Sequence, residues 1–284
     1  MDAAPASFVL LWSTGFIGMR YGAPYAEPFT FMAIRMALVV SILCVVALAT
    51  RAPWPASKAE ALHMAVAGLL VHGTYLCGVL YAVKNGLSLG YVALITGVQP
   101  ILTAALATGF LHERLNARQW LGMGLGLTGV ALVVSSKFSL EGPNWLAMGF
   151  AVIGLCGITF GTLYQKRHCQ NMDLRTGGIV QFGATGLALT ALAFMFETRA
   201  VIWVPQFVFA LSWLTIVLSL GAISLLYLMI RQGAASKVAS LFFLTPSVTA
   251  VMAFFLFDEV LNATAITGLA VTAVGVALVM RAGK

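Results

Sequence analysis

A histidine within an apolar stretch is the first residue of this chain that could take part in ligand chemistry. His72 and Tyr75 are three positions apart, so a helix would place both on one face. An imidazole in such a stretch must face protein or water, because burying an unpaired polar group costs free energy. Two interpretations stay open. Either His72 hydrogen-bonds a solute and can titrate, or it is bonded to a neighbouring carbonyl group and only packs.

Two prolines mark a second group of polar residues. Gln99 directly precedes Pro100 and Thr96 lies one turn earlier, while Thr245 precedes Pro246 in the second half. Proline removes one backbone donor and frees a carbonyl group one turn earlier. The neighbouring side chains could therefore present polar atoms to a zwitterionic solute, or they could satisfy the interrupted helix itself. Both alternatives stay open, and the prolines fit a hinge role in either case.

Aromatic and small polar side chains recur on other stretches of the chain. A single aromatic residue in an apolar helix is more often a packing residue or an anchor than a ligand contact. Their joint presence predicts an aromatic-lined neutral cavity, which suits amino acids with apolar or aromatic side chains. The candidates for solute contact in this group are Trp12, Ser13, Phe16, Tyr81, Trp213, Ser224, Tyr227 and Phe242.

The composition indicates which elements must hold these residues. Of the 284 residues, 61% are hydrophobic and 9% are charged, whereas about 25% are charged in ordinary soluble domains. So few charges cannot cover a soluble fold, and we predict an all-α integral membrane protein. A helix needs about 20 mainly apolar residues to cross the hydrocarbon layer. Ten segments satisfy this: 6–22, 29–49, 62–83, 88–111, 117–136, 145–165, 176–196, 207–230, 234–257 and 263–281.

The two halves of the sequence match each other at one constant spacing. Apolar composition alone would match some Ala, Val and Leu residues, but not Pro, Glu, Asn and Gly together, so the chain is a tandem repeat. We predict two repeats, residues 1–140 and 141–284. Each contains five segments, so the second copy enters the membrane inverted, as in secondary transporters. The aligned pairs include Pro100 and Pro246, Glu113 and Glu259, Asn116 and Asn262, Gly122 and Gly268, and Gly129 and Gly275.

Lysine and arginine residues are divided unevenly among the predicted loops. With the N-terminus inside, the inner loops and the C-terminal tail hold most of them, which also explains the net charge of +7. Because basic loops favour the cytoplasmic side, we expect both termini to lie in the cytoplasm. We expect the protein to be integral to the plasma (bacterial inner) membrane. We expect no nucleic-acid partner, no cofactor and no metal ion, and a chain that functions as a monomer.

The positions of the charged residues exclude several classes of function. All nine carboxylates fall in predicted loops or at segment ends, whereas a proton-coupled cation exporter usually buries one. No Lys or Arg lies at the centre of the segments expected to line a site, which disfavours phosphorylated substrates. An intramembrane enzyme would need a nucleophile–base pair or a metal cluster at membrane depth, and His72 has no such partner beside it in the sequence.

The remaining polar residues and glycines receive structural interpretations. Arg35, near the outer start of the second segment, could extend its charge to the surface, and we expect it to brace this segment against a helix end. Asn116 and Asn262 are predicted N-caps, while Glu113 and Glu259 serve the adjacent turns or pair loops as a gate. Close packing of the fifth and tenth segments is expected at small residues: Gly122, Gly129, Gly268 and Gly275.

Several motifs carry a family resemblance. They are Arg35 in the second segment, Tyr81 followed by small residues, the mid-helix Pro100, the turn Glu113–Leu115, and the run ending at Gly129–Leu132. In these the chain resembles the drug/metabolite transporter superfamily, EamA type, over essentially its whole length. The resemblance implies ten transmembrane helices, with the first, third, fourth, sixth, eighth and ninth lining a cavity. The stretch Val71–Tyr75 is also similar to YddG-type exporters of aromatic and other neutral amino acids.

Together these observations predict a secondary transporter for neutral, above all aromatic, amino acids and related small metabolites, working by alternating access. The alternative is an exporter of drugs or nucleosides with broad specificity. Without a buried carboxylate, downhill efflux or exchange is at least as compatible with the sequence as proton antiport through His72.

Overall fold

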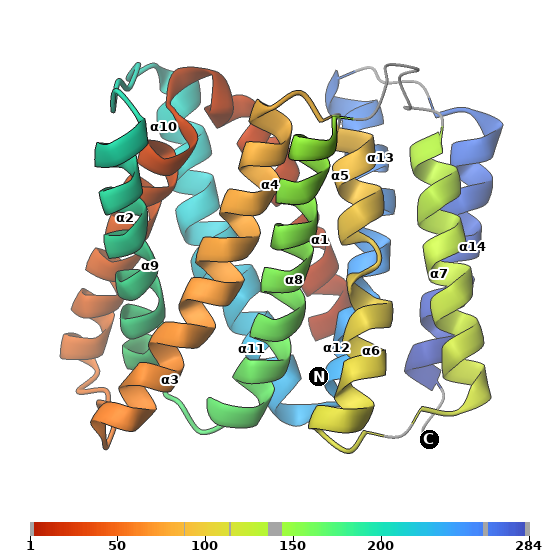
Figure 1. Ribbon diagram of the computed structural model, residues 1–284, viewed down its shortest axis with the longest axis horizontal. Helices are drawn as coiled ribbons and strands as arrows, with labels where there is room; N and C mark the ends of the chain where they lie inside the picture. The colour runs from red at the N-terminus through yellow and green to blue at the C-terminus, as the bar shows by residue number, and fades with distance from the viewer. Residues whose placement is uncertain (1–2, 88, 114, 136–143, 258–260, 282–284) are drawn as a thin grey trace.

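The chain folds into helices that run side by side along most of their length (Figure 1). The computed structural model describes residues 3–87, 89–113, 115–135, 144–257 and 261–281. In these ranges there is no strand, and Ala26 and Val201 form one isolated β-bridge. The first-half elements are α1 (Ala4–Gly22), η1 (Ala23–Tyr25), α2 (Pro28–Ala49), α3 (Lys58–Gly68), η2 (Leu69–Thr74), α4 (Tyr75–Lys84), α5 (Leu89–Thr96), α6 (Gln99–Phe110) and α7 (Ala117–Ser135). The second-half elements are α8 (Trp145–His168), α9 (Leu174–Phe196), α10 (Pro205–Trp213), η3 (Leu214–Ala222), α11 (Ile223–Gln232), α12 (Ala235–Ser240), η4 (Leu241–Phe243), α13 (Leu244–Phe257) and α14 (Ala263–Arg281).

Nine helical stretches of the described chain are long and apolar enough to cross a membrane. The predicted all-helical membrane architecture is thereby confirmed. The first helix, α1, has 19 residues but is not among the nine, so the count of ten spans stays a prediction.

In Figure 1, α1 begins and α14 ends toward the lower side, where segments 50–57 and 169–173 also lie. We call this side the basic end and the other side, with residues 23–27 and 197–204, the opposite end.

Four of the long helical stretches are interrupted or change their winding. The stretch Lys58–Lys84 contains the π-helical η2, and Pro205–Gln232 contains the π-helical η3. Near Pro246, the short α12 passes through the 3₁₀ segment η4 into α13. Near Pro100, α5 ends at Thr96 and α6 begins at Gln99. Both predicted hinge prolines therefore lie at breaks in helical winding, while movement at these breaks stays a prediction.

Side-chain caps explain where several helices begin. Asn116 Oδ1 accepts a hydrogen bond from the Gln119 amide at 2.9 Å, and Gln119 Oε1 accepts one from the Asn116 amide at 3.0 Å. This reciprocal pair is a capping box at the start of α7. Asn262 Oδ1 accepts from the Ala265 amide at 2.8 Å at the start of α14. Both asparagines thus occupy the capping positions that the sequence predicts.

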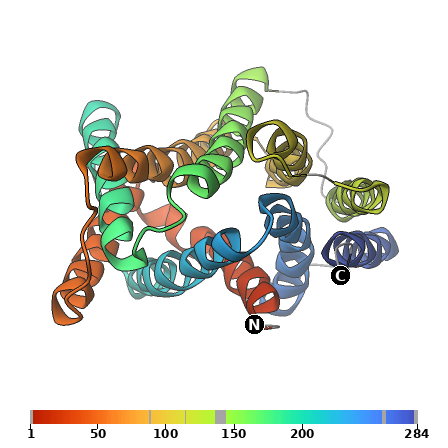
Figure 2. The same cartoon turned by 90° about the horizontal axis from the view of Figure 1, so that it is seen from below.

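Helices α7 and α14 form the most extensive helix pair and lie together at one edge of the molecule (Figure 2). Glycines bring the two backbones together. A Cβ atom on Gly122 would lie 2.6 Å from the Gly275 carbonyl oxygen, and one on Gly129 would lie 2.7 Å from the Gly268 carbonyl oxygen. Real side chains do not tolerate such distances, so each glycine is required for this close approach.

Helices α2 and α9 form a second antiparallel pair, which is fastened at both ends. At the opposite end, the buried Glu197 carboxylate accepts hydrogen bonds from the Phe29 and Thr30 amides at 2.8 and 2.7 Å. Glu27 Oε2 accepts from the Thr198 amide at 2.7 Å and from its hydroxyl group at 2.8 Å. These bonds lower the pKa of the Glu27 carboxyl group, with the Thr198 hydroxyl as the largest contribution. Each carboxylate thus caps or anchors the other helix of the pair.

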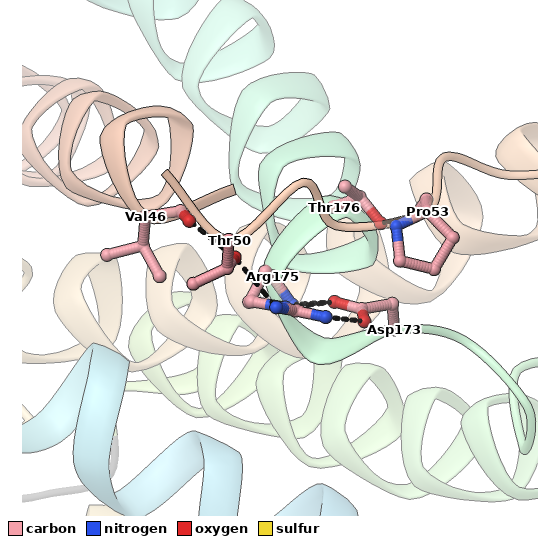
Figure 3. A network of polar contacts seen from close by, with 6 residues as sticks. All are labelled: Val46, Thr50, Pro53, Asp173, Arg175 and Thr176. Carbon is pink, nitrogen blue, oxygen red and sulfur yellow. Dashed lines mark hydrogen bonds and ion pairs between the residues drawn. The ribbon is translucent and has the colours of Figure 1, made fainter. Parts of the chain in front are cut away.

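At the basic end, α9 begins beside the loop that follows α2 (Figure 3). Asp173 accepts from the Arg175 amide at 2.9 Å and forms an ion pair with its guanidinium group at 2.5 Å. Arg175 also donates to Thr50 Oγ1 at 2.7 Å, and the Thr176 hydroxyl donates to the Pro53 carbonyl oxygen at 2.6 Å. The bonds from Arg175 lower the pKa of Asp173 to about 2. These contacts join the two halves of the chain at the basic end.

Candidate functional site

A chain of buried polar side chains links four helical stretches. Tyr227 Oη of α11 lies 3.1 Å from His72 Nε2 and donates to Gln181 Oε1 of α9 at 2.7 Å. Gln181 Nε2 donates in turn to Gln165 Oε1 of α8 at 2.8 Å. All four side chains are buried. We call them the polar network. Because polar groups in apolar surroundings must be paired, these bonds hold segments from both halves of the chain at fixed positions.

Apolar and thioether groups surround the polar network. The Phe182 ring stacks on the His72 imidazole with 4.3 Å between centroids, and Met172 Sδ lies 3.4 Å from the amide nitrogens of both Gln165 and Gln181. Within the described ranges, no carboxylate makes a hydrogen bond or an ion pair with His72. Neutral donors and acceptors of this kind select a solute by hydrogen bonding and shape rather than by net charge.

The π-helical segment η2 positions His72, and glycines allow its neighbours to come close. A Cβ atom on Gly68 would lie 2.5 Å from the Gln181 carbonyl oxygen, and one on Gly157 would lie 2.8 Å from the Tyr75 amide nitrogen. The wider winding of a π-helix leaves carbonyl groups less regularly paired and is common at functional sites. Tyr75 follows η2 directly, its side chain is buried, and its backbone lies against Gly154 and Gly157 of α8. The predicted pair His72 and Tyr75 is therefore enclosed, with His72 alone in the polar network.

Arg35 lies on α2 and points toward the second π-helical segment, η3. Its Nε and Nη2 atoms donate to Ser219 Oγ at 3.0 and 2.8 Å, and its Nη1 atom lies 3.9 Å from Met32 Sδ. The side chain is only 2% exposed, so it neither extends to the surface nor braces a helix end as the sequence suggests. Burying an isolated charge costs about 20 kcal/mol in the idealised limit and several kcal/mol effectively. A neutral hydroxyl group offsets only part of that cost.

The proline-linked polar residues divide into bonded and unbonded groups. Gln99 Nε2 donates to Thr103 Oγ1 at 3.1 Å, but Gln99 Oε1 is buried without a partner in the described chain. Thr245 Oγ1 is likewise buried and unpartnered, while its carbonyl oxygen lies 3.3 Å from Ser13 Oγ. Thr96 instead donates to the Val92 carbonyl oxygen at 2.8 Å. Thr96 therefore satisfies its own helix, whereas Gln99 and Thr245 keep free polar atoms.

An aromatic cluster joins α1 to the break between α12 and α13. Trp12 meets the Phe242 ring edge-on at 5.0 Å, and Phe8 contacts both rings at 5.4 and 5.3 Å. Ser13, next to Trp12, donates to the Val9 carbonyl oxygen at 2.7 Å. Three of the predicted aromatic-face residues are thus brought together. The predicted contact Phe16 has a side chain outside the described part of the structure.

Other predicted contact residues lie away from the polar network. Trp213 Nε1 donates to Thr14 Oγ1 at 3.0 Å and lines a groove of about 550 Å³ between α1, α10 and α13. Tyr81 packs on Phe29 at 4.6 Å near the opposite end. Ser224 is partly buried on α11, one turn before Tyr227. These residues do not form one site with His72 in this conformation.

Glu113 joins the two halves at the basic end. Its carboxylate accepts from the Ala235 amide at 2.7 Å, and from the amide and hydroxyl groups of Ser236 at 3.2 and 2.7 Å. The carboxylate therefore caps the short helix α12 rather than its own turn. Its repeat counterpart, Glu259, lies outside the described residues.

Sequence analysis did not predict three residues that form the buried hydrogen bonds of the candidate site. Gln165 and Gln181 complete the polar network, and Ser219 accepts both hydrogen bonds from Arg35. Their positions in the sequence could have indicated them, because an amide or hydroxyl group within a long apolar stretch must find a hydrogen-bond partner. The described chain brings together no group of three His, Cys, Asp or Glu residues that could hold a metal ion.

Comparison with known proteins agrees with this architecture. The model of the EamA-like transporter family matches residues 6–135. The chain is 26% identical to an uncharacterized transporter, YvbV, of Bacillus subtilis (strain 168), over 98% of this chain and 91% of that protein. It is 27% identical to an uncharacterized transporter of Archaeoglobus fulgidus, over 88% of this chain and 87% of that one.

Two further similarities extend across most of the chain. A WAT1-related chloroplast protein of Arabidopsis thaliana is 24% identical over 94% of this chain and 66% of its own length. A crystal structure of a protein 18% identical in sequence superposes with a TM-score of 0.78, covering 98% of this chain and 96% of that one. At such low identity the superposition supports the fold alone.

Proposed function

We propose that this chain, whose residues 6–135 match the EamA-like transporter family, carries neutral, above all aromatic, amino acids and related small metabolites across the membrane by alternating access. The matched family and the similar protein of Bacillus subtilis are both named as transporters and not as enzymes. The observation that carries the proposal is the buried polar network of His72, Tyr227, Gln181 and Gln165, which joins both halves of the chain without a carboxylate.

The contacts of α7 with α14 support two inverted five-helix repeats. Gly122 meets Gly275, and Gly129 meets Gly268. Gly268 and Gly275 are the sequence counterparts of Gly122 and Gly129, so each glycine meets the counterpart of the other. Reciprocal contacts of this kind are expected from a two-fold axis. In this account the ten helices include α1, and the repeats are residues 1–140 and 141–284.

The interrupted helices support movement about the site. The π-helical segments η2 and η3 occupy equivalent positions in the two halves, and so do the breaks near Pro100 and Pro246. Irregular backbone at membrane depth is tolerated where it lines a cavity or is buried in protein. We propose that these four irregular segments bend when the binding site changes sides. The protein would act as a monomer in a bacterial inner membrane, with both termini in the cytoplasm.

The aromatic cluster supports the preference for aromatic side chains. Trp12 and Phe242 form an apolar surface at the break before α13, while Gln99 Oε1 and Thr245 Oγ1 provide polar atoms without partners. A solute with one apolar side chain and a zwitterionic end could use both kinds of group.

A competition experiment tests the substrate class. Uptake of radiolabelled L-phenylalanine would be measured in proteoliposomes that contain the purified protein. Unlabelled neutral amino acids, nucleosides and hydrophobic cations would be added as competitors, with and without a pH gradient. The proposal predicts saturable uptake that neutral amino acids inhibit and nucleosides do not, compared with protein-free liposomes. Inhibition by chemically unrelated compounds would instead favour the exporter of broad specificity. Uptake driven by the pH gradient would make His72 the candidate proton carrier.

A further inference from the structure

Arg35 is a buried cation whose bonded partners are all neutral. Ser219 Oγ accepts two of its N–H groups, and the remaining contact is with Met32 Sδ at 3.9 Å, which is long for a hydrogen bond. A guanidinium group offers five N–H donors in a planar fork. The described chain gives it no ion pair, although it is 98% buried.

Packing alone does not account for an arginine at this place. In the second repeat the position that corresponds to Arg35 is Gln181 on α9, whose buried neutral amide is bonded to Gln165 of α8 and Tyr227 of α11. Two arginines of the basic end illustrate ordinary partners: Arg175 pairs with Asp173, and Arg231 donates to the Gln170 carbonyl oxygen at 2.5 Å. Among the arginines whose side chains the structure describes, Arg35 alone combines deep burial with neutral partners.

Unpartnered hydroxyl groups lie on the elements around Arg35. Thr215 Oγ1, one turn before Ser219 on η3, is buried without a partner in the described chain, and so is Thr185 Oγ1 on α9. Thr185 packs on Gly73, the residue after His72, because a Cβ atom on Gly73 would lie 3.8 Å from its methyl carbon. Unpartnered hydroxyl groups are therefore present on η3 and α9, two elements that pack against α2.

We infer that Arg35 binds the carboxylate group of the transported solute, with Ser219 holding the guanidinium group in position while the site is empty. This inference rests on the proposed function and specifies its substrate class. The planar fork of arginine matches the two oxygens of a carboxylate. A phosphoryl group would require a second cation, and no other Lys or Arg lies within the described helices at this depth.

The inference makes stability and transport respond in opposite ways. Replacing a buried, uncompensated charge with an apolar side chain of similar length is often neutral or stabilising. Arg35→Met should therefore leave Tm unchanged or raise it while transport is lost. A structural arginine would behave differently, because its removal would lower Tm and transport together.

Transport and thermal unfolding are measured on the same purified variants, with L-phenylalanine and L-phenylalaninamide, which lacks the carboxylate, as competitors of labelled L-phenylalanine. With the wild-type protein, the concentration needed for half-inhibition should be about tenfold or more lower for L-phenylalanine than for L-phenylalaninamide. This is the effect expected of one charged hydrogen-bonded pair. Arg35→Met should lose this preference, and Arg35→Lys should keep part of it. The matched control, Arg231→Met, removes an exposed arginine of the basic end and should change neither property.

Three results would overturn the inference and leave amino-acid transport standing: no preference in the wild type, a preference retained by Arg35→Met, or a loss of transport in Arg35→Met that parallels a loss of Tm. Absence of any saturable amino-acid transport in the wild type would instead refute the proposed function itself, and the inference with it.

Discussion

The Tyr227 hydroxyl group is the branching point of the polar network, because it contacts His72 and Gln181 at once. Tyr227→Phe removes this hydroxyl and leaves two buried polar atoms without a partner, at a cost of about 1–3 kcal/mol. If the network binds the solute, the variant should raise the KM of amino-acid transport about tenfold.

Tyr164→Phe is the matched control for that variant. It removes a hydrogen bond of the same kind, between Tyr164 Oη and His63 Nδ1 at 2.6 Å, which lies near the basic end and outside the network. We expect its KM to stay within about twofold of wild type. Equal effects of the two variants would show that the network has only a structural role.

Asp173 gives a prediction about pH. Its folded pKa of about 2 lies below the ordinary value of 3.8, first because Arg175 donates to it. A depressed carboxyl pKa contributes stability that is present above about pH 4 and is lost as the pH falls toward 2. Asp173→Asn should lower Tm slightly at pH 7, since the pair is partly exposed to solvent, and should weaken the further fall of Tm between pH 4 and 2. An identical pH profile for both proteins would contradict this assignment.

The residues of the network show how far sequence reasoning reached. His72 and Tyr227 could be named because a ring with polar atoms is conspicuous in an apolar stretch. Their contact could not be predicted, because the two positions are far apart in the sequence and meet only through helix packing. Gln181 was not among the predicted site residues, because neither periodicity nor composition distinguishes a bonded amide from an isolated one.

Among the elements, the α7–α14 pair depends most directly on single residues. A Cβ atom on Gly129 would overlap Thr272 and lie 2.7 Å from the Gly268 carbonyl oxygen. Overpacking of this kind costs about 1–3 kcal/mol. Gly129→Ala should therefore lower Tm by roughly 3–10 °C, measured by thermal unfolding in detergent.

Gly124→Ala is the control on the same helix, where a Cβ atom would have no neighbour within 4 Å. Alanine stabilises an exposed helix position by about 1 kcal/mol relative to glycine, so this variant should keep or raise Tm. A similar loss of Tm in both variants would contradict the role assigned to close packing of α7 and α14.

The helix boundaries were predictable, whereas the changes in winding were not. The second segment was expected at 29–49 and is observed at Pro28–Ala49, because apolar length and the Pro28 start define it. The prolines indicated the breaks near residues 100 and 246. No comparable residue marks η2 and η3, because a π-helix arises from packing against neighbouring helices and leaves no simple sequence pattern.

At the scale of the whole molecule, the repeated sequence motifs and the reciprocal glycine contacts favour one binding site shared by two similar halves. Elements from both halves bear the polar network, and Glu113 of the first half caps α12 of the second. Under the proposed function, a single site of this kind would face one side at a time, and the carrier would change conformation in each cycle.

Counterflow tests this central claim most directly. Proteoliposomes loaded with unlabelled L-phenylalanine would be diluted into a trace of labelled L-phenylalanine, and internal label would be followed with time. Alternating access predicts that the internal solute accelerates entry and that the label rises transiently above its equilibrium level, with a smaller rise in Tyr227→Phe. Entry that is unaffected by internal solute and shows no transient rise would contradict an alternating carrier.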